Sequence, residues 1–271
     1  MDLTIIRKNG DVLNTKDYNI KVLKFNKGFP TIRHETEKIE DREGFIDLGS
    51  FYEDRQMSAS CYFYGVDNLD TPLVQNDIFK LFDSRESFYL IDSREPGKQW
   101  EVKTDSQFTM DQRIATFGTF EITFIGKPYA LSVASTITDL STDADAWQIG
   151  QGLVIDDSID YTFTTSSFQI FNAGDVPVDP RTDEIEITFT GASSNLTITN
   201  NTTGDVWNYT ETSNASDVIR LTGIRSTKNN ISIFGKTNRK LITLKEGYND
   251  FTITGATGSF SIEFDFRFKY L

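Results

Sequence analysis

Apolar and polar residues alternate over much of the chain, and the alternation is strictest in residues 259–271. Polar or charged side chains occupy one set of alternate positions there, and large apolar side chains occupy the other. The apolar set consists of Phe260, Ile262, Phe264, Phe266, Phe268 and Tyr270. Successive side chains of a β-strand point to opposite faces, so this pattern predicts a long strand with one buried face. We expect this strand to anchor the core of a β-sandwich.

Residues 168–205 show the same alternation, divided by short polar segments. Ile185, Ile187 and Phe189 recur at every second position, and the polar segments are rich in the Asn, Asp and Gly that tight turns favour. The region therefore predicts a series of strands and turns without a catalytic motif. Further strands are predicted at residues 147–155, 161–164, 218–221 and 230–234.

The first half of the chain contains a long strand pattern at residues 55–64, and shorter strands are predicted at residues 3–6, 19–25, 88–91, 100–102 and 118–125. Residues 55–64 predict a long strand, and Met57, Ala59, Cys61 and Phe63 would share its apolar face. The polar residues between them would share the opposite face. We therefore expect this strand to be half-buried against a core.

A helix and a long polar excursion are also predicted in the first half. Asp70, Thr71 and Pro72 form a helix start signal, and apolar residues follow at helical spacing up to Phe82. Residues 28–43, by contrast, are polar and charged and lack a regular period. They predict an extended loop or a hairpin arm that reaches away from the core, and excursions of this kind often serve contacts.

Composition supports a mainly β protein. Of the 271 residues, 38% are hydrophobic, and the 22 Phe and 10 Tyr have large flat side chains that favour strands. We expect residues 1–130 to form a β-sandwich or barrel-like domain with one helix and a hairpin arm. The many short strands of residues 131–271 favour a jelly-roll or galectin-like β-sandwich.

The charge balance excludes some function classes. The chain has 27 basic and 40 acidic residues and a formal net charge of −13. Proteins grip nucleic acid largely through Lys and Arg that neutralise phosphates, so this chain is a poor candidate for binding DNA or RNA. No segment approaches the roughly 18 apolar residues that span a bilayer, and the N-terminus lacks a basic start followed by an apolar run. We expect neither membrane insertion nor conventional secretion.

Catalytic and metal-binding motifs are weak. The only histidine, His34, lies in the charged excursion, and the only cysteine, Cys61, lies on an apolar strand face, so we expect a surface histidine and a buried, unreactive thiol. Some local groups of carboxylates resemble the acidic pair of a glycoside hydrolase or the start of a calcium loop, but a chain this acidic produces such groups by chance. These groups are Asp183, Glu184 and Glu186; Asp156, Asp157 and Asp160; and Asp143 and Asp145. We expect no enzyme activity, no bound metal and no cofactor.

Two stretches, taken in their order and spacing, resemble the distal tail protein family of siphophages, often called Dit. The first is GTFEITFIGKPYA at residues 118–130, preceded by the predicted helix and by FYLIDSREPGKQWEV at residues 88–102. The second begins with FQIFNAG at residue 168, continues through DPRTDEIEITFTG and NLTITNNTTGD, and ends in SFSIEFDFRFKY. The resemblance covers nearly the whole chain.

This resemblance implies a structural virion protein at the tip of a long flexible phage tail, made in the cytoplasm of the bacterial host. Six copies would form a ring from their N-terminal halves, continuing the tail tube, and the galectin-like C-terminal halves would project outward. The implied partners are other copies of the chain in a homo-hexamer, the tail tube protein, a tail-associated tip protein, and receptor-binding or baseplate components. DNA would pass through the central channel only in transit.

A ring that closes by rotation needs two different complementary surfaces on each subunit. We expect them on the polar excursion of residues 28–43 and along the edges of the strand at residues 55–64. The predicted interface residues are Arg33, His34, Glu35, Arg42, Arg55, Tyr62 and Tyr64.

Two other functions stay open from the sequence. A carbohydrate-binding β-sandwich that contacts a bacterial cell-wall polymer would present exposed aromatic side chains, and Trp147, Trp207 and Tyr209 are the candidates. A glycan hydrolase is the third hypothesis, and it would require one of the acidic groups to form a catalytic pair.

Overall fold

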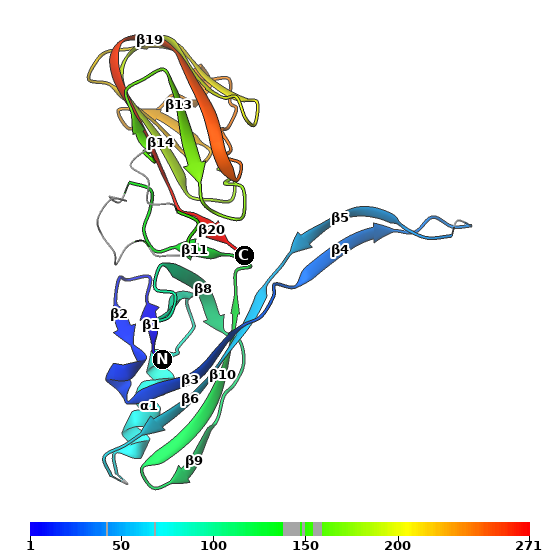
Figure 1. Ribbon diagram of the computed structural model, residues 1–271, viewed down its shortest axis with the longest axis vertical. Coiled ribbons are helices and arrows are strands. Elements are labelled where there is room, and N and C mark those ends of the chain that lie inside the picture. The colour runs from blue at the N-terminus through cyan, green and yellow to red at the C-terminus, as the bar shows by residue number, and fades with distance from the viewer. Residues whose placement is uncertain (42, 68, 138–146, 148–149, 154–158) are drawn as a thin grey trace. The chain divides into compact units, whose positions relative to one another are not determined.

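The computed structural model describes the whole chain apart from residues 42, 68, 138–146, 148–149 and 154–158 (Figure 1). The chain divides into two compact units, Met1–Ala130 and Leu131–Leu271. Both consist mainly of antiparallel β-strands, and α1 (Thr71–Leu81) is the one α-helix in the described part of the chain. The predicted mainly β fold with one helix is therefore confirmed.

The first unit is built on one sheet with the strand order β2-β1-β7-β8-β10-β6-β3, and β9 pairs with β10. The strands are β1 (Leu3–Ile6), β2 (Val12–Asn14), β3 (Ile20–Lys27), β6 (Arg55–Tyr64), β7 (Phe88–Asp92), β8 (Lys98–Thr104), β9 (Met110–Ile114) and β10 (Phe117–Gly126). A 3-10 turn, η1 (Thr15–Tyr18), links β2 to β3. In this order β2 and β3 end the sheet.

The core of the first unit lies on one face of β6 and β10. These strands pair along their full length, from Tyr64 opposite Phe117 to Arg55 opposite Gly126. The predicted apolar face of β6 is confirmed, because all four of its apolar side chains are buried; they are Met57, Ala59, Cys61 and Phe63. α1 begins after Asp70 with a proline in its first turn and buries Val74, Ile78 and Leu81. Removing these large side chains from water is the main stabilising contribution to the unit.

A hairpin projects from the first unit and pairs with no other strand of the described chain. It consists of β4 (Ile32–Glu37) and β5 (Ile46–Tyr52), which form a separate two-stranded sheet. Figure 1 shows it as a long blue ribbon that leaves the sheet beside β3 and β6. Two backbone hydrogen bonds close its base, from Thr31 N to Asp54 O and from Glu53 N to Thr31 O. The excursion predicted at residues 28–43 is therefore a hairpin arm, and its return strand extends it to Tyr52. We call residues 32–52 the hairpin arm.

The second unit is a sheet in the order β12-β19-β14-β16-β17-β18, to which β13 adds on β19 and β15 adds on β14. Its strands are β12 (Thr162–Phe163), β13 (Ser167–Asn172), β14 (Ile185–Asn200), β15 (Asp205–Ser213), β16 (Val218–Thr222), β17 (Arg225–Lys228), β18 (Ile231–Ser232) and β19 (Gly247–Phe266), with a 3-10 turn η2 (Phe234–Lys236). Two short strands, β11 (Ala130–Ser132) and β20 (Lys269–Tyr270), pair with each other outside this sheet. The predicted strands at residues 161–164, 218–221 and 230–234 correspond to β12, β16 and β18. The prediction at residues 147–155 falls largely outside the described residues.

The long central strands of the second unit bend over its core. The rings of Phe251 and Phe264 both belong to β19 and lie 4.9 Å apart. A straight strand would separate residues 13 positions apart by about 40 Å, so β19 turns back on itself. Gly255 lies between them with φ +82°, and an added Cβ there would meet Asn195 O at 2.5 Å. The bend therefore requires glycine and forms two layers from one sheet.

The structure corrects the bounds of the strand predicted at residues 259–271. β19 begins 12 residues earlier than predicted, at Gly247, and ends at Phe266, before the short strand β20. The apolar face predicted for residues 259–271 is largely confirmed, because all its members from Ile262 to Tyr270 are buried. Phe260 is only half-buried and stacks on Phe189 at 5.4 Å.

Candidate functional site

The hairpin arm is not packed against the core of the first unit, because β4 and β5 form a separate two-stranded sheet. β4 and β5 pair from Ile32 opposite Tyr52 to Glu37 opposite Ile46. A two-stranded ribbon has no second layer to cover either face, and an isolated hairpin is at best marginally stable in water. The arm therefore needs a covering surface from elsewhere to become a stable element.

Large apolar side chains are exposed along the arm. Phe45 is 66% exposed and Phe51 is 57% exposed. The exposed apolar residues on and beside the arm are Phe29, Ile32, Ile39, Phe45, Ile46, Leu48, Phe51 and Tyr52. A pocket of about 80 Å³ at the far end is lined by Ile39, Phe45 and Ile46 together with Glu37 and Glu43. Apolar surface that extends over a whole element marks a place where another molecule binds.

Three of the predicted interface residues lie together on the arm. Arg33 pairs with Glu35 at 3.1 Å and with Glu53 at 3.5 Å, and all three side chains are exposed. His34 is exposed, as predicted, and its Nδ1 lies 2.7 Å from Ser50 Oγ. Arg42 lies outside the described residues. Exposed ion pairs of this kind contribute about 0–1 kcal/mol, so these charges decide which partner fits more than how tightly it binds.

Arg55 lies at the base of the arm and is buried. It is 4% exposed, and its guanidinium lies over the Trp100 ring at 4.6 Å. Burial lowers the pKa of Arg55, and the nearby Tyr129 and Tyr52 partly oppose that shift. The Tyr52 ring contacts Phe29 at 5.7 Å and Tyr129 at 6.0 Å. Arg55 therefore stabilises the start of the arm within its own unit and offers little surface to a partner.

The last two predicted interface residues are on β6. Tyr62 is half-buried and packs on Phe117 at 5.5 Å, whereas Tyr64 is 49% exposed. Tyr62 stabilises the pairing of β6 with β10, and Tyr64 is the more exposed of the two side chains. The structure thus divides the predicted interface residues among the arm, its base and β6.

A basic sheet edge is a candidate surface that the sequence analysis missed. β3 ends the strand order of the first unit, and the lysines in and beside it are Lys16, Lys21, Lys24 and Lys27. Lys21 lies 3.6 Å from Asp2, and Lys27 lies 3.4 Å from Asp92. Lys24 pairs with no carboxylate of the described residues, and the neighbouring Leu23 is 62% exposed. The clue in the sequence was three lysines within an eight-residue strand of an acidic chain.

The aromatic residues predicted to contact carbohydrate are not an exposed platform. Trp207 is 1% exposed and Tyr209 is fully buried, so the expectation that they are exposed is wrong. Both lie on the core face of β15, since alternate residues of a strand share a face. Trp147 is half-buried and packs on Phe268 at 5.6 Å. These aromatic side chains therefore pack within the second unit.

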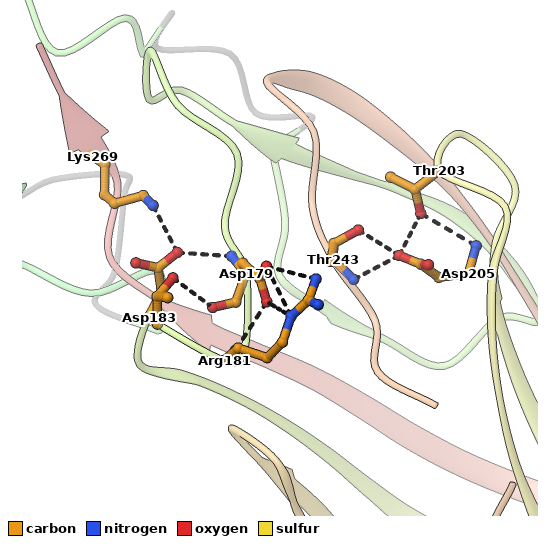
Figure 2. Close-up of polar contacts among 8 residues, drawn as sticks. Asp179, Arg181, Asp183, Thr203, Asp205, Thr243 and Lys269 are labelled. Atoms are coloured by element: carbon orange, nitrogen blue, oxygen red, sulfur yellow. Dashed lines mark hydrogen bonds and ion pairs between the residues drawn. The ribbon is translucent and has the colours of Figure 1, made fainter. Parts of the chain in front are cut away.

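Cys61, Asp183 and Glu186, three of the remaining candidates, are engaged structurally. Cys61 is 1% exposed, and burial raises the pKa of its thiol to about 12, so the reactive thiolate is scarce at neutral pH. Asp183 accepts a hydrogen bond from Lys269 Nζ at 2.7 Å (Figure 2), and Glu186 accepts one from Thr222 Oγ1 at 2.8 Å. Of the other acidic groups, Asp160 is described, whereas Asp143, Asp145, Asp156 and Asp157 lie outside the described residues.

Neither a metal site nor a membrane span is found within the described ranges. No group of three or more His, Cys, Asp or Glu side chains there is arranged to hold a metal ion. No described helix has both the length and the hydrophobicity to cross a membrane.

Part of the chain matches a known protein family. Residues 8–125 match the family described as the phage tail protein RIFT-related domain. This match contains all of the hairpin arm and most of the sheet from which it projects, but not β1. No characterised protein sequence matches the chain closely enough to count as a relative.

Among solved structures, the crystal structure of Dit from phage SPP1 matches with a TM-score of 0.69 at 14% identity. The match covers 98% of this chain and 99% of that one, and that protein is described as a paradigm of the hub adsorption apparatus in phages that infect Gram-positive bacteria. Chains of the phage p2 baseplate, in its activated conformation with strontium and with calcium, match with TM-scores of 0.46 and 0.47 at 8% and 9% identity. Each covers 98% of this chain and 97% of the baseplate chain. The similarity to siphophage Dit expected from the sequence is confirmed at the level of fold.

Proposed function

We propose that the chain is a structural hub of a phage tail, because residues 8–125 match the phage tail protein RIFT-related domain and the whole chain has the fold of the Dit protein of phage SPP1. In this proposal six copies form a ring at the distal end of the tail, in the virion, after synthesis in the cytoplasm of the host. The first unit makes the ring, and the second unit is a galectin-like sandwich that presents surface to other tail components. The chain acts by assembly and not as an enzyme.

The observation that carries the proposal is the exposed apolar surface of the hairpin arm. β6 buries its large apolar side chains, whereas Phe45 and Phe51 are more than half exposed on a ribbon without a second layer. Burial of apolar area contributes roughly 25 cal/mol per Å², so covering these side chains would stabilise a complex substantially. A second copy of the chain is always available to cover them in an oligomer of identical subunits.

The basic edge supplies the second surface that a closed ring requires. Each subunit of a ring offers one surface to its neighbour on one side and a different surface on the other. The hairpin arm is acidic, with Glu35, Glu37, Glu40, Asp41 and Glu43 among its residues. The basic edge has lysines and the exposed Leu23 beside an edge strand. In our proposal the arm of one subunit lies along the basic edge of the next, which matches both charge and apolar surface.

The proposed ring joins a tail tube protein on one side to a tail-associated tip protein and receptor-binding or baseplate components on the other. Its central channel passes DNA. The net charge of −13 supports this role, because an acidic surface repels phosphates and DNA can slide past it without being held. The chain therefore contacts DNA only in transit.

The decisive experiment measures the assembly state of the purified chain. Mass photometry across a range of concentrations, followed by cryo-electron microscopy, should show six-fold rings with an open centre. The arm of each subunit should reach its neighbour in the reconstruction. A protein that stays monomeric in mass photometry, and still fails to form rings when concentrated for microscopy, would refute the proposed hub.

A further inference from the structure

A polar groove lies in the second unit, separate from the hairpin arm and the basic edge. It has a volume of about 550 Å³, within the roughly 300–1,000 Å³ typical of ligand sites. We define the polar groove by the residues that line it: Ser135, Asp183, Glu184, Ile185, Glu186, Thr222, Gly223, Arg225, Asp265, Phe266 and Arg267. Most of these side chains are charged or hydroxylated, which makes an apolar occupant unsuitable.

The floor of the groove is a row of polar residues in register across four strands. Asp265 on β19 lies opposite Glu186 on β14, Glu186 lies opposite Thr222 on β16, and Thr222 lies opposite Arg225 on β17. Directly opposite residues of antiparallel strands share a face, so all four side chains emerge on the same side of the sheet. The strands are roughly 4.8 Å apart, which gives an ordered series of acceptors and donors.

The turn between β16 and β17 fixes one end of the row. Gly223 has φ +56° at the first position of this two-residue turn, a backbone region that favours glycine. Its N–H donates to Ile185 O at 3.0 Å, which holds the turn against the start of β14. Arg225 is the first residue after this turn, so the turn fixes the position of its backbone at the groove.

Several charged groups of the groove already have partners. Asp183 is paired with Lys269 at 2.7 Å, and it also accepts from Asp179 N at 2.7 Å (Figure 2). Glu186 pairs with Arg220 at 3.5 Å. Arg267 Nη1 donates to the backbone carbonyl groups of residues 132 and 133. These contacts shape the walls and leave little capacity for a ligand.

Three other groups have no hydrogen-bond partner among the described residues. Glu184 and Arg225 are exposed and unpaired, and Asp265 Oδ1 is shielded from solvent without a donor. A shielded oxygen without a donor is destabilising, so a group that donates to it is favoured at this place. The groove therefore offers unused acceptors at Glu184 and Asp265 and unused donors at Arg225.

We propose that the polar groove binds a neutral glycan through vicinal hydroxyl groups. A hydroxyl group both donates and accepts, so adjacent hydroxyls can donate to Asp265 and Glu184 and accept from Arg225. An anionic ligand would meet several carboxylates, and a simple cation would meet two guanidinium groups. A metal ion is disfavoured as well, because no three metal-ligating side chains of the described residues are arranged to hold one. The proposal rests on the second unit alone and is independent of ring formation.

Binding of short oligosaccharides tests the groove directly. The full chain is titrated with neutral tetrasaccharides of glucose, galactose and rhamnose, with polyglycerol phosphate as the anionic comparison, and followed by isothermal calorimetry. We expect at least one neutral tetrasaccharide to bind with a millimolar or lower Kd. Glu184→Gln and Arg225→Ala should each weaken that binding at least fivefold, because both side chains are exposed and their loss leaves the fold intact.

Matched controls separate binding from folding and charge. Glu246→Gln makes the same change as Glu184→Gln at an exposed position outside the groove, and its Kd should stay within twofold of the parent. Asp265→Asn is a second groove variant, and all variants are compared by thermal unfolding. The proposal is overturned if no neutral tetrasaccharide binds, if polyglycerol phosphate binds instead, or if the groove variants bind as the parent does. Ring formation, measured in parallel, should be unchanged in every variant.

Discussion

β5 and β6 are neighbouring strands in sequence, separated only by Glu53 and Asp54, yet they have opposite relations to solvent. β6 buries Met57, Ala59, Cys61 and Phe63 against a sheet. β5 carries comparable apolar residues, and six of its seven residues are exposed. The difference arises from their surroundings, because β6 lies between β3 and β10 whereas β5 pairs only with β4. An apolar strand pattern therefore identifies a surface that needs covering, and the rest of the structure decides whether the same chain or another one covers it.

The largest expected effect separates the two strands by stability. Phe63 on β6 is fully buried, so Phe63→Ala should destabilise the first unit by about 3–5 kcal/mol through lost burial and a new cavity. Phe51→Ala on the arm is the matched change at an exposed site and should alter unfolding of the isolated chain by less than about 0.5 kcal/mol. Chemical denaturation at a protein concentration below assembly measures both. Equal losses of unfolding free energy in the two variants would contradict the view that β6 is a core strand and β5 is not.

The next effect concerns assembly, where we expect substitutions on the arm to matter although they hardly change the stability of the isolated chain. Leu48→Ser combined with Phe51→Ser removes two exposed apolar side chains from the arm, and it should weaken ring formation at least tenfold while leaving the unfolding midpoint unchanged. The control is Ile224→Ser, which removes a 60% exposed apolar side chain from the second unit and should leave ring formation intact. Mass photometry of dilution series gives the assembly constants. If the control disrupts rings as strongly as the arm variant, the arm has no special role.

A smaller effect is the pH dependence of the stability of the first unit, which Asp92 on β7 contributes to. Burial alone would raise the pKa of Asp92, but hydrogen bonds from Arg94 and the charges of Lys27 and Arg94 outweigh it and hold the pKa below its usual value. A carboxyl with a depressed folded-state pKa contributes stability above about pH 4, the unfolded value, and this contribution disappears as pH falls through the folded value. Asp92→Asn should cost on the order of 1.5 kcal/mol at pH 7 and much less near pH 2. Thermal unfolding across this range should show the variant and the parent converging at low pH; a constant difference would contradict the assignment.

The smallest effect tests the basic edge. Lys24→Glu reverses an unpaired exposed charge on β3, and it should weaken ring formation by a few-fold at low salt, with less than about 1 kcal/mol involved. Lys103→Glu makes the same charge change at an exposed position on β8 and should have no effect. The Lys24 effect should fade at high salt, because screening shortens the reach of exposed charges. Rescue of Lys24→Glu by Glu35→Lys or Glu37→Lys on the arm would locate the contact, whereas equal assembly of the parent and both lysine variants would exclude it.

Much of the fold could be predicted from the sequence, because its strands follow the two-residue period. The pattern identified β6 with its ends, the helix after Asp70 and the polar excursion that forms the arm. It missed the bend of β19 at Gly255, because period-two alternation is local and continues on both sides of a turn in direction. Bends of this kind depend on which strands pair, and such pairings bring together residues far apart in sequence.

The candidate surfaces were harder to predict, because exposure is a property of the packed structure. Trp207 and Tyr209 looked like a sugar platform, although large aromatic residues lie in cores more often than on surfaces. Arg55 looked like an interface charge, and the ring of Trp100 buries it. The polar groove depends on Asp265, Glu186, Thr222 and Arg225, which come from four strands and meet only through the sheet register.

The bend in β19 also sets the order in which the chain can fold during synthesis. The first unit has all its strands once residue 126 has been made, whereas both layers of the second unit wait for β19, which ends at Phe266. At about 5–20 residues per second, the ribosome needs roughly 7–28 s to add those last 140 residues. Throughout this interval the strands β1–β10, including the whole hairpin arm, have already been made, whereas β19 is incomplete. The surface that we propose for assembly is therefore synthesised before the second unit can close its two layers.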